Sequence, residues 1–428
     1  MQGLVIAPFF WQYNFCSHFV DKIRIVLILF FKKFIMGNIR YTSSGESHGK
    51  ALTGIIEGIP AGLSLTSDDI DRDLKRRQKG YGRGGRMKIE SDRAEILSGV
   101  RWGKTLGSPI SLLIENRDWK NWTEGMSVYE QYENSIGPVT RARPGHADLN
   151  GAIKYNQKDI RNILERSSAR ETAMRVAIGA TVKRFLSEFG IKIGSYIIEI
   201  GNQGTEISGP DKDGRDFLKS FKVAEGSPVR CPDEKASKKM MKLIDTAKAE
   251  GYSLGGVFEV FATGLPIGIG SHVQWDRRLD GKLAQALMSI QAVKGVEIGG
   301  GFGMAQRPGF RVMDEIYYKK GRGFFRKTNN AGGVEGGMTN GMPLILRAAM
   351  KPIPTQRNPL KSVDIVTKRS IRAAYERSDV CAVPAAGVIG EAMAALVLAD
   401  AFLEKFGGDS MEETKRNYDA YMDYVKEF

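Results

Sequence analysis

One stretch near the C-terminus constrains the fold more than any other. Residues 390–408, GEAMAALVLADAFLEKFGG, have helical character, and their apolar side chains go nearly all the way round between Ala392 and Ala399. A helix that is apolar on every side has to be buried, because none of its faces can be left to water. We therefore predict a core helix here, with other elements packed around it.

A second helix is predicted within residues 167–190, SSARETAMRVAIGATVKRFLSEFG. Ser168 and Glu171 have the S-x-x-E spacing of a capping box, which defines where the helix begins. An apolar stripe follows at every third or fourth position: Met174, Ile178, Val182, Phe185 and Phe189. Unpaired N–H groups at a helix start attract anions. The residues expected there are Ser167, Ser168 and Arg170.

Four shorter runs are rich in β-branched and aromatic residues and are predicted as strands. They are residues 51–59, 110–116, 192–200 and 255–265. The 428 residues, 42% hydrophobic and 26% charged, are enough to bury a core in one large domain or a few smaller ones. From Met36 onward there is no low-complexity linker and no repeat of solenoid length.

Residues 1–35 differ from the rest, with nine aromatic residues and one acidic residue, Asp21. Their apolar run, IVLILFF, is too short for a bilayer span, which needs about 20 residues. No small-residue cleavage site follows, so a signal peptide is a poor match. We predict that Met36 is the true start and that the domain covers residues 36–428. The alternative is an interfacial anchor helix, since basic and aromatic residues suit a membrane surface.

The net charge of +14 raises the question of nucleic-acid binding. Much of the excess lies in residues 71–88 and in isolated arginines beside glycines, without a stacking-aromatic motif. A small polyanionic substrate fits this distribution better. Cys16, Cys231 and Cys381 lie far apart and never in a C-x-x-C pair, which indicates neither a disulfide framework nor a zinc site and favours a reducing cytoplasm.

The segment SSGESHGKALTG, residues 43–54, contains Gly-Lys but is not a P-loop. A P-loop has four residues between its glycines and a Ser or Thr after the lysine. Here three residues separate Gly45 from Gly49, and Lys50 is followed by Ala51. The segment therefore offers a histidine in a loop framed by glycines.

Outside the extension, the histidines are His48, His146 and His272. The first two lie in loops beside glycine and cationic residues, whereas His272 resembles part of a strand. His146 and Asp148 supply at most two ligands and no H-E-x-x-H motif occurs, so we expect no metal site. A Ser-His-Asp hydrolase is disfavoured because GESHG puts serine next to histidine, where adjacent side chains cannot readily form the required hydrogen bond. His48 and His146 are left as candidates for proton transfer.

Arg77, Arg83 and Arg86 are spaced by Tyr81 and four glycines, which suggests a flexible clamp for an anion. The alternative is a solvated basic loop. Further along, Arg377 and Asp379 come just before the core helix, where an aspartate can also cap a turn. Glycine-rich stretches at 295–303 and 331–341 would allow a close backbone approach to a ligand.

Taken together, these segments resemble the chorismate synthase family. GESHG, RPGHAD, RSSARETAMRVA, LMSIQAVKGVEIG and RSDVCAVPA are similar to its signatures, in the same order. The resemblance covers nearly the whole chain after the extension, which has no counterpart in the family. It implies an α+β fold, with a single large domain built as a β-α-β sandwich, and a homotetramer. Gln291 stands where family members often have Asn.

The resemblance also implies the reaction. The family converts 5-enolpyruvylshikimate 3-phosphate into chorismate by a 1,4-anti elimination of phosphate, the last common step of the shikimate pathway to aromatic amino acids. It requires reduced FMN although there is no net redox change, and NADPH is needed only if the chain reduces its own flavin. A substrate with one phosphate and two carboxylates explains the arginines, which bind such groups in bidentate fashion.

Roles follow residue by residue from the same resemblance. His48 would protonate the departing phosphate, His146 would protonate or hold the reduced flavin, and Asp379 would assist removal of the C6 proton through flavin N5. The expected substrate contacts are Arg77, Arg83, Arg86, Arg143, Arg170 and Arg377. The expected flavin contacts are Arg166, Ser167, Ser168, Gln291, Ala292, Gly336, Lys351, Pro352, Ile353, Pro354, Thr355 and Arg377.

Two other function classes compete with this one. An RNA-binding protein could use KGYGRGGR as an RGG-like segment, but this leaves the two histidine loops and the pair Ser167 and Ser168 unexplained. An ordinary flavin oxidoreductase would consume reductant with each product formed. We expect a small-molecule substrate, with neither nucleic acid nor a membrane as partner.

Overall fold

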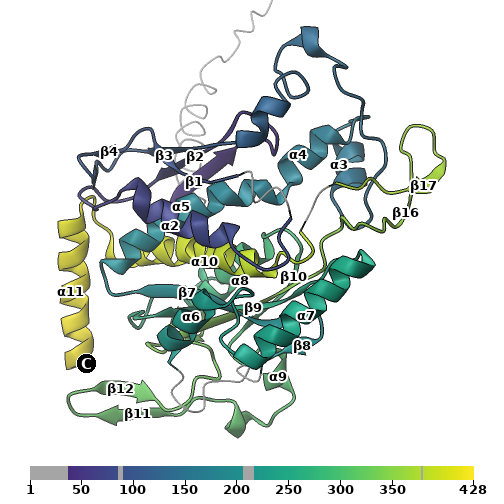
Figure 1. Ribbon diagram of the computed structural model, residues 1–428. Helices are drawn as coiled ribbons and strands as arrows, with labels where there is room; N and C mark the ends of the chain where they lie inside the picture. The colour runs from purple at the N-terminus through teal and green to yellow at the C-terminus, as the bar shows by residue number, and fades with distance from the viewer. Residues whose placement is uncertain (1–36, 85–89, 206–215, 377–378) are drawn as a thin grey trace, which may run out of the picture.

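Two antiparallel sheets enclose a layer of helices in the computed structural model, which describes residues 37–84, 90–205, 216–376 and 379–428 (Figure 1). The first sheet has the order β1 Arg40–Ser44, β2 Ala51–Glu57, β6 Ile110–Glu115 and β3 Glu95–Ile96. The second has the order β10 Val293–Ile298, β15 Leu344–Met350, β9 Gly256–Thr263, β7 Lys192–Ile200 and β8 Gln203–Gly204. The expected α+β class and β-α-β sandwich are confirmed.

The helices between the sheets are α2 Ser67–Gln78, α5 Thr172–Ser187, α8 Leu279–Met288 and α10 Val383–Phe406. Helix α5 packs on the first sheet and α10 on the second, and the two helices pack on each other. They approach closely at Gly179, where a Cβ would lie 2.2 Å from the Cβ of Ala392. A side chain at position 179 would therefore force the two helices apart.

Helix α10 is the predicted core helix, and it begins seven residues before the predicted start. Pro384 stands in its first turn, a position where proline loses no helical hydrogen bond. By length and hydropathy α10 could cross a membrane, but 89% of its most apolar window is buried inside the fold. This burial is what its all-round apolar sequence predicts.

Helix α5 follows a 3-10 turn, Ala169–Glu171, and the predicted capping box forms only in part. Ser168 Oγ accepts a hydrogen bond from the Arg170 backbone N–H at 3.3 Å. The Glu171 carboxylate does not complete the box. It instead accepts from Arg175 Nε at 2.8 Å and from Gln291 Nε2 at 3.0 Å. That half of the prediction is wrong, because side-chain donors from Ser43, Arg175 and Gln291 bind Glu171.

The four predicted strands are β2, β6, β7 and β9, with ends within two residues of those expected. Further helices lie around the sandwich: α3 Asp148–Lys154, α4 Arg161–Ser167, α6 Phe217–Gly226, α7 Glu234–Glu250, α9 Phe302–Ala305 and α11 Met411–Glu427. Short strand pairs are β4 Val100–Arg101 with β5 Lys104–Thr105, β11 Ile316–Lys319 with β12 Gly323–Arg326, β13 Val334–Glu335 with β14 Met338–Thr339, and β16 Lys361–Val363 with β17 Ser370–Arg372.

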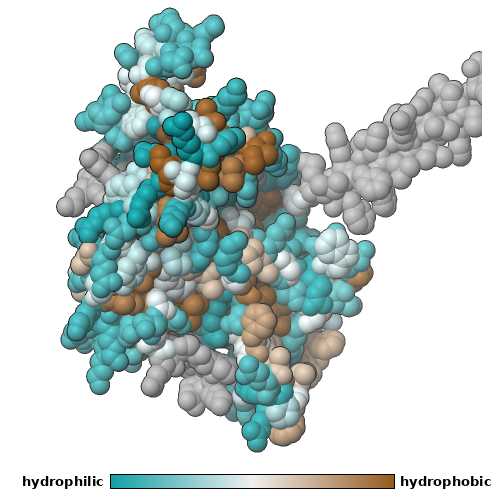
Figure 2. Space-filling model, turned by 90° about the vertical axis from the view of Figure 1, so that its right-hand side faces the viewer, coloured by the Kyte–Doolittle hydropathy of each residue, from teal (hydrophilic) through white to brown (hydrophobic). Residues whose placement is uncertain are grey.

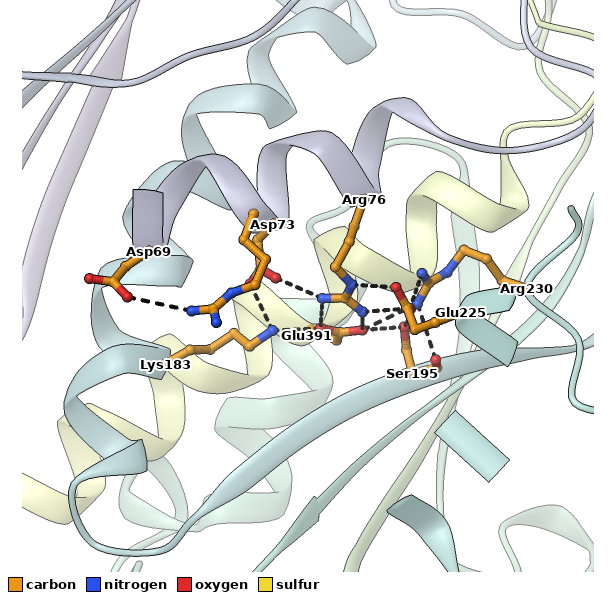
Figure 3. Close-up of polar contacts among 9 residues, drawn as sticks. Asp69, Asp73, Arg76, Lys183, Ser195, Glu225, Arg230 and Glu391 are labelled. Atoms are coloured by element: carbon orange, nitrogen blue, oxygen red, sulfur yellow. Dashed lines mark hydrogen bonds and ion pairs between the residues drawn. The ribbon is translucent and has the colours of Figure 1, made fainter. Parts of the chain in front are cut away.

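A cluster of charged side chains lies between the helix layer and the second sheet (Figure 3). At its centre is Glu391 of α10, which is fully buried. Its carboxylate accepts from Arg76 of α2 at 2.6 and 2.7 Å, from Lys183 of α5 at 2.6 Å and from Ser195 of β7 at 2.7 Å. Burial raises the pKa of Glu391, but Arg76 and Lys183 outweigh burial and hold that pKa well below its ordinary value. The cluster thus ties three helices and a strand together.

Candidate active site

Side chains from distant parts of the chain meet at the loops on one side of the helix layer. Ser47 Oγ lies 3.1 Å from Ser168 Oγ, which joins the β1–β2 loop to the end of α4. Glu171 then contacts Gln291, and the backbone N–H of Lys351 donates to the Ala292 carbonyl at 2.9 Å. Two further contacts extend this series of contacts into the loop before α3. Lys351 Nζ donates to the Gly145 carbonyl at 2.9 Å, and Arg143 Nη1 donates to Thr355 Oγ1 at 3.2 Å.

His48 is held between a carboxylate and an aromatic ring. Its Nδ1 lies 2.7 Å from Glu165 Oε1, and its backbone N–H donates to Glu165 Oε2 at 2.7 Å. Its ring contacts the Trp122 ring in a tilted arrangement with centroids 4.3 Å apart, and Nε2 is 4.0 Å from Asp118 Oδ2. The side chain keeps 14% of its surface exposed, so a ligand can reach it.

His146 has a carboxylate partner as well, but one that is shared with an arginine. Its Nδ1 lies 2.5 Å from Asp148 Oδ1, while Arg143 donates to both Asp148 oxygens at 2.8 and 3.0 Å. Although burial raises the pKa of Asp148, the hydrogen bonds from His146 and Arg143 hold it well below its ordinary value. Asp148 therefore stays ionised and orients both His146 and Arg143. Among the described residues, no group of three or more His, Cys, Asp and Glu could hold a metal ion.

Two buried arginines near Ser168, Arg77 and Arg170, share one aspartate, Asp92. Arg170 Nη1 donates to Asp92 Oδ1 at 2.5 Å, and Arg77 Nη1 lies 3.4 Å from Asp92 Oδ2. Arg77 also donates to Thr172 Oγ1 at 3.0 Å. Burial lowers the pKa of Arg77 to about 10; Asp92 opposes the shift, and repulsion from Arg83 and Arg170 adds to it. The guanidinium stays cationic at neutral pH, and a bound anion would relieve that repulsion.

Arg83 and Asp379 form the third part of the site, on the wall of a cavity of about 530 Å³. Arg83 Nη1 lies 2.9 Å from Asp379 Oδ2, and the Gly84 backbone N–H donates to Asp379 Oδ1 at 2.6 Å. The neighbouring Tyr81 hydroxyl donates to Asp245 of α7 at 2.8 Å. This part of KGYGRGGR therefore packs against acidic side chains, which disfavours its interpretation as a free RNA-binding segment. It also disfavours the solvated basic loop.

The expected flavin residues fall into two groups. Arg166 donates to the Ser43 carbonyl at 2.8 Å and Ser167 Oγ to the Ile163 carbonyl at 2.9 Å, so both are engaged within the protein. Gln291 Oε1 is buried and accepts no hydrogen bond from the described residues. Ala292 has a φ of +67°, which is uncommon for a residue with a side chain and is found preferentially at functional sites.

Residues 351–355, KPIPT, lie beside Gln291 and Ala292, and the pKa of Lys351 is shifted from its ordinary value. Burial and the nearby Lys294 lower the pKa of Lys351. Gly336 lies elsewhere, in the turn between β13 and β14, with open space around the position of a Cβ. That hairpin packs near the start of β15, whereas Lys351 follows its end, so the single chain does not bring Gly336 to the other residues. Arg86 and Arg377 lie outside the described residues.

Several residues of the site escaped the sequence analysis. They are partners of the histidines and arginines, of which Trp122 is partly buried and the others buried: Glu165, Asp92, Asn116 and Trp122. Asp148 was considered only as a weak metal ligand. The first four lie in ordinary stretches of sequence and contact residues brought near by the fold, so local spacing carries no signal for them.

Comparison with known proteins identifies close relatives along nearly the whole chain. A family model described as chorismate synthase matches residues 39–403. Chorismate synthase of Aquifex aeolicus is 59% identical over 397 residues, covering 91% of this chain and 99% of the relative. That of Geobacter metallireducens is 56% identical, covering 91% and 100%. A crystal structure of chorismate synthase is similar with a TM-score of 0.74 and 50% identity, covering 91% of this chain and 99% of that one.

Proposed function

The chain belongs to the chorismate synthase family, and we propose that the loops around His48 and the buried arginines are where it acts. Its reaction is the 1,4-anti elimination of phosphate from 5-enolpyruvylshikimate 3-phosphate, which gives chorismate, in the shikimate pathway. The observation that carries the assignment of the site is the position of His48, a largely buried ring that keeps 14% of its surface exposed and is held in one orientation close to a group of paired, buried cations.

The arginines would bind the three anionic groups of the substrate. Arg77 and Arg170 are already anchored by Asp92, so binding an anion costs little side-chain ordering. Their mutual repulsion favours a bound phosphate or carboxylate between them. Arg83 and Arg143 would bind from two further sides, and Arg86 and Arg377 are proposed to join them.

Each of the three acid–base groups has a separate place in this proposal. His48 would donate a proton from Nε2 to the phosphate as it leaves, since its Nδ1 is engaged by Glu165. His146 would keep its Nε2 toward the flavin, since Nδ1 is engaged by Asp148. Asp379, oriented by Arg83 and the Gly84 N–H, would help remove the C6 proton.

Reduced FMN fits the residues expected to hold it. The buried Gln291 Oε1 can accept a hydrogen bond from a ring N–H, and the perturbed Lys351 would gain from a nearby anion. Ala292, in its left-handed conformation, presents backbone at the same place. Reduced FMN, when bound, supplies an electron-rich ring that assists departure of the phosphate without net oxidation. NADPH would take part only if this chain reduces its own flavin.

The family's homotetramer is proposed for this chain as well, in the cytoplasm. Large aromatic side chains are well exposed away from the site: Trp102, Trp275, Phe302, Phe310 and Phe428. Figure 2 also shows apolar side chains among hydrophilic ones on the face where α3 and α4 lie in Figure 1. Subunit contacts would cover such side chains, and a neighbouring subunit could complete the flavin site at Gly336.

An anaerobic assay with purified protein, substrate and chemically reduced FMN tests the proposal. We expect the absorbance of chorismate to rise through many turnovers while the reduced flavin persists; oxidised FMN, as a control, should support no turnover. Oxidation of one flavin for each product formed would instead identify an ordinary flavin oxidoreductase. Salt-sensitive RNA binding with no chorismate formed would favour the nucleic-acid alternative.

A further inference from the structure

We propose that Glu165 is a positioning residue for proton transfer by His48, an inference that rests on the proposed function. Glu165 belongs to α4, and His48 lies 117 positions earlier in the β1–β2 loop. The glutamate side chain is 2% exposed. A carboxylate that is buried so completely needs partners, and its two oxygens both contact His48.

The contacts fix the imidazole at two points. Glu165 Oε2 accepts from the backbone N–H of His48 at 2.7 Å, and Oε1 lies 2.7 Å from Nδ1 of the ring. The Ser47 backbone N–H also donates to the Glu165 carbonyl at 3.0 Å, which joins loop and helix backbones directly. Trp122 covers one face of the ring. Rotation of the imidazole would therefore break a short hydrogen bond and the ring contact with Trp122 together.

This geometry selects one tautomer. An ionised carboxylate can only accept hydrogen bonds, so the hydrogen between Oε1 and the ring belongs to Nδ1. Neutral His48 then carries its hydrogen on Nδ1, and Nε2 is the atom that gains and loses the proton. The other carboxylate near the ring, Asp118, is 4.0 Å from Nε2, too far for a direct hydrogen bond.

The charges around the two histidines differ in a way that favours His48 as the acid. Asp148, the partner of His146, already binds Arg143 through both oxygens. Glu165 has Arg161 only at 3.9 Å, and that guanidinium lies over Trp122 at 5.0 Å. Glu165 is therefore engaged chiefly by His48, whereas Asp148 divides its oxygens between His146 and Arg143. Charged groups near the His48 ring include Glu165, Asp118 and, through Glu165, Arg161.

Glu165 neither gains nor loses a proton during the proton transfer from His48. As the C–O bond to phosphate breaks, its electron pair stays on the phosphate oxygen, which takes the proton from Nε2 of His48. The ring is left neutral with its hydrogen on Nδ1, still donated to Glu165. Solvent returns a proton to Nε2 before the next turnover, while the C6 proton leaves through the separate base. The ring keeps one orientation in both states, so no reorganisation accompanies the step.

Kinetics of Glu165→Gln test the inference. The amide can still accept from Nδ1 but lacks the charge, and we expect kcat to fall roughly 10- to 100-fold, the range for loss of a carboxylate that orients a histidine. KM for the substrate should change less than about threefold, because Glu165 does not touch it. The matched control is Glu188→Gln, an exposed carboxylate paired with Arg184, which should leave kcat unchanged.

A double variant separates positioning from a general structural role. If Glu165 acts through His48, then adding Glu165→Gln to His48→Ala should cause no further loss of kcat. Independent, multiplying losses would overturn the inference, as would an unchanged kcat in Glu165→Gln.

Nitrogen-15 NMR of the parent protein labelled in its histidine rings gives a readout that does not depend on turnover or on the folding of Glu165→Gln. We expect the His48 signals, assigned by their loss in His48→Ala, to show hydrogen on Nδ1 at every pH where the ring is neutral. Hydrogen on Nε2 would refute the inference. Hydrogen on Nδ1 together with full turnover by His48→Ala would instead reject the proposed role of His48, while the orientation by Glu165 would stand.

Discussion

Replacing Glu391 by Gln should destabilise the protein more than its small change in size suggests. The carboxylate is fully buried and is contacted by Arg76, Lys183, Ser195 and Arg230. Gln keeps the volume but removes the charge, which leaves three buried or partly buried cations without their central anion. Breaking a buried ion pair in this way costs about 3–5 kcal/mol. Domains are typically stable by about 5–15 kcal/mol, so a large part of the stability would be lost.

Equilibrium urea unfolding followed by circular dichroism measures this loss. The control is Glu188→Gln, which removes an exposed ion pair with Arg184 and should cost no more than about 1 kcal/mol. The reasoning would be refuted if Glu391→Gln unfolded at the same urea concentration as the control. That result would mean that the charged cluster in Figure 3 does not hold α2, α5, β7 and α10 together.

The same cluster predicts a pH dependence. The pKa of Glu391 is lower in the folded protein than its ordinary value of 4.5, so its contribution to stability is fully present above about pH 4.5. The contribution is lost as the pH falls below that value toward the folded-state pKa. As the pH is lowered from about 4.5, the parent should therefore lose more stability than Glu391→Gln. Parallel losses in the two proteins would contradict this assignment.

Two further substitutions test the site. Ser168→Ala should cost about 1 kcal/mol of stability through the lost cap on Arg170, and should also weaken FMN binding; unchanged FMN affinity would show that the serine is only a cap. Arg83→Ala should raise KM for the substrate strongly, whereas Arg184→Ala, which removes a cation paired on the surface of α5, should not, and neither parent nor variants should bind RNA measurably. RNA binding by the parent that Arg83→Ala abolishes would favour the nucleic-acid hypothesis.

The parts of the fold that follow from local pattern could be predicted from the sequence. The all-round apolar run gave the buried helix α10, and β-branched runs gave β2, β6, β7 and β9. The predicted stretch began at Gly390, so the first seven residues of α10, Val383–Ile389, were missed. The capping box failed because Glu171 meets Arg175 and Gln291, and the second of these lies 120 positions away.

The candidate site shows the same division. His48, Arg77 and Asp379 could be named from motifs and from family resemblance, but their partners could not. Successive helical residues point about 100° apart, so Arg76 and Arg77 face different clusters, one structural and one at the site. Which of the two faces the site depends on how α2 packs against α5 and α10. That packing is a property of the whole fold.

Single-turnover phosphate release tests most directly whether His48 gives the proton to the leaving phosphate. Under anaerobic conditions, with reduced FMN and substrate both bound, His48→Ala should release phosphate roughly 10²- to 10⁴-fold more slowly than the parent. Reduced FMN should bind to this variant normally, whereas His146→Ala should alter the reduced-flavin spectrum. Phosphate release at the parental rate by His48→Ala, with flavin and substrate shown to be bound, would contradict the account.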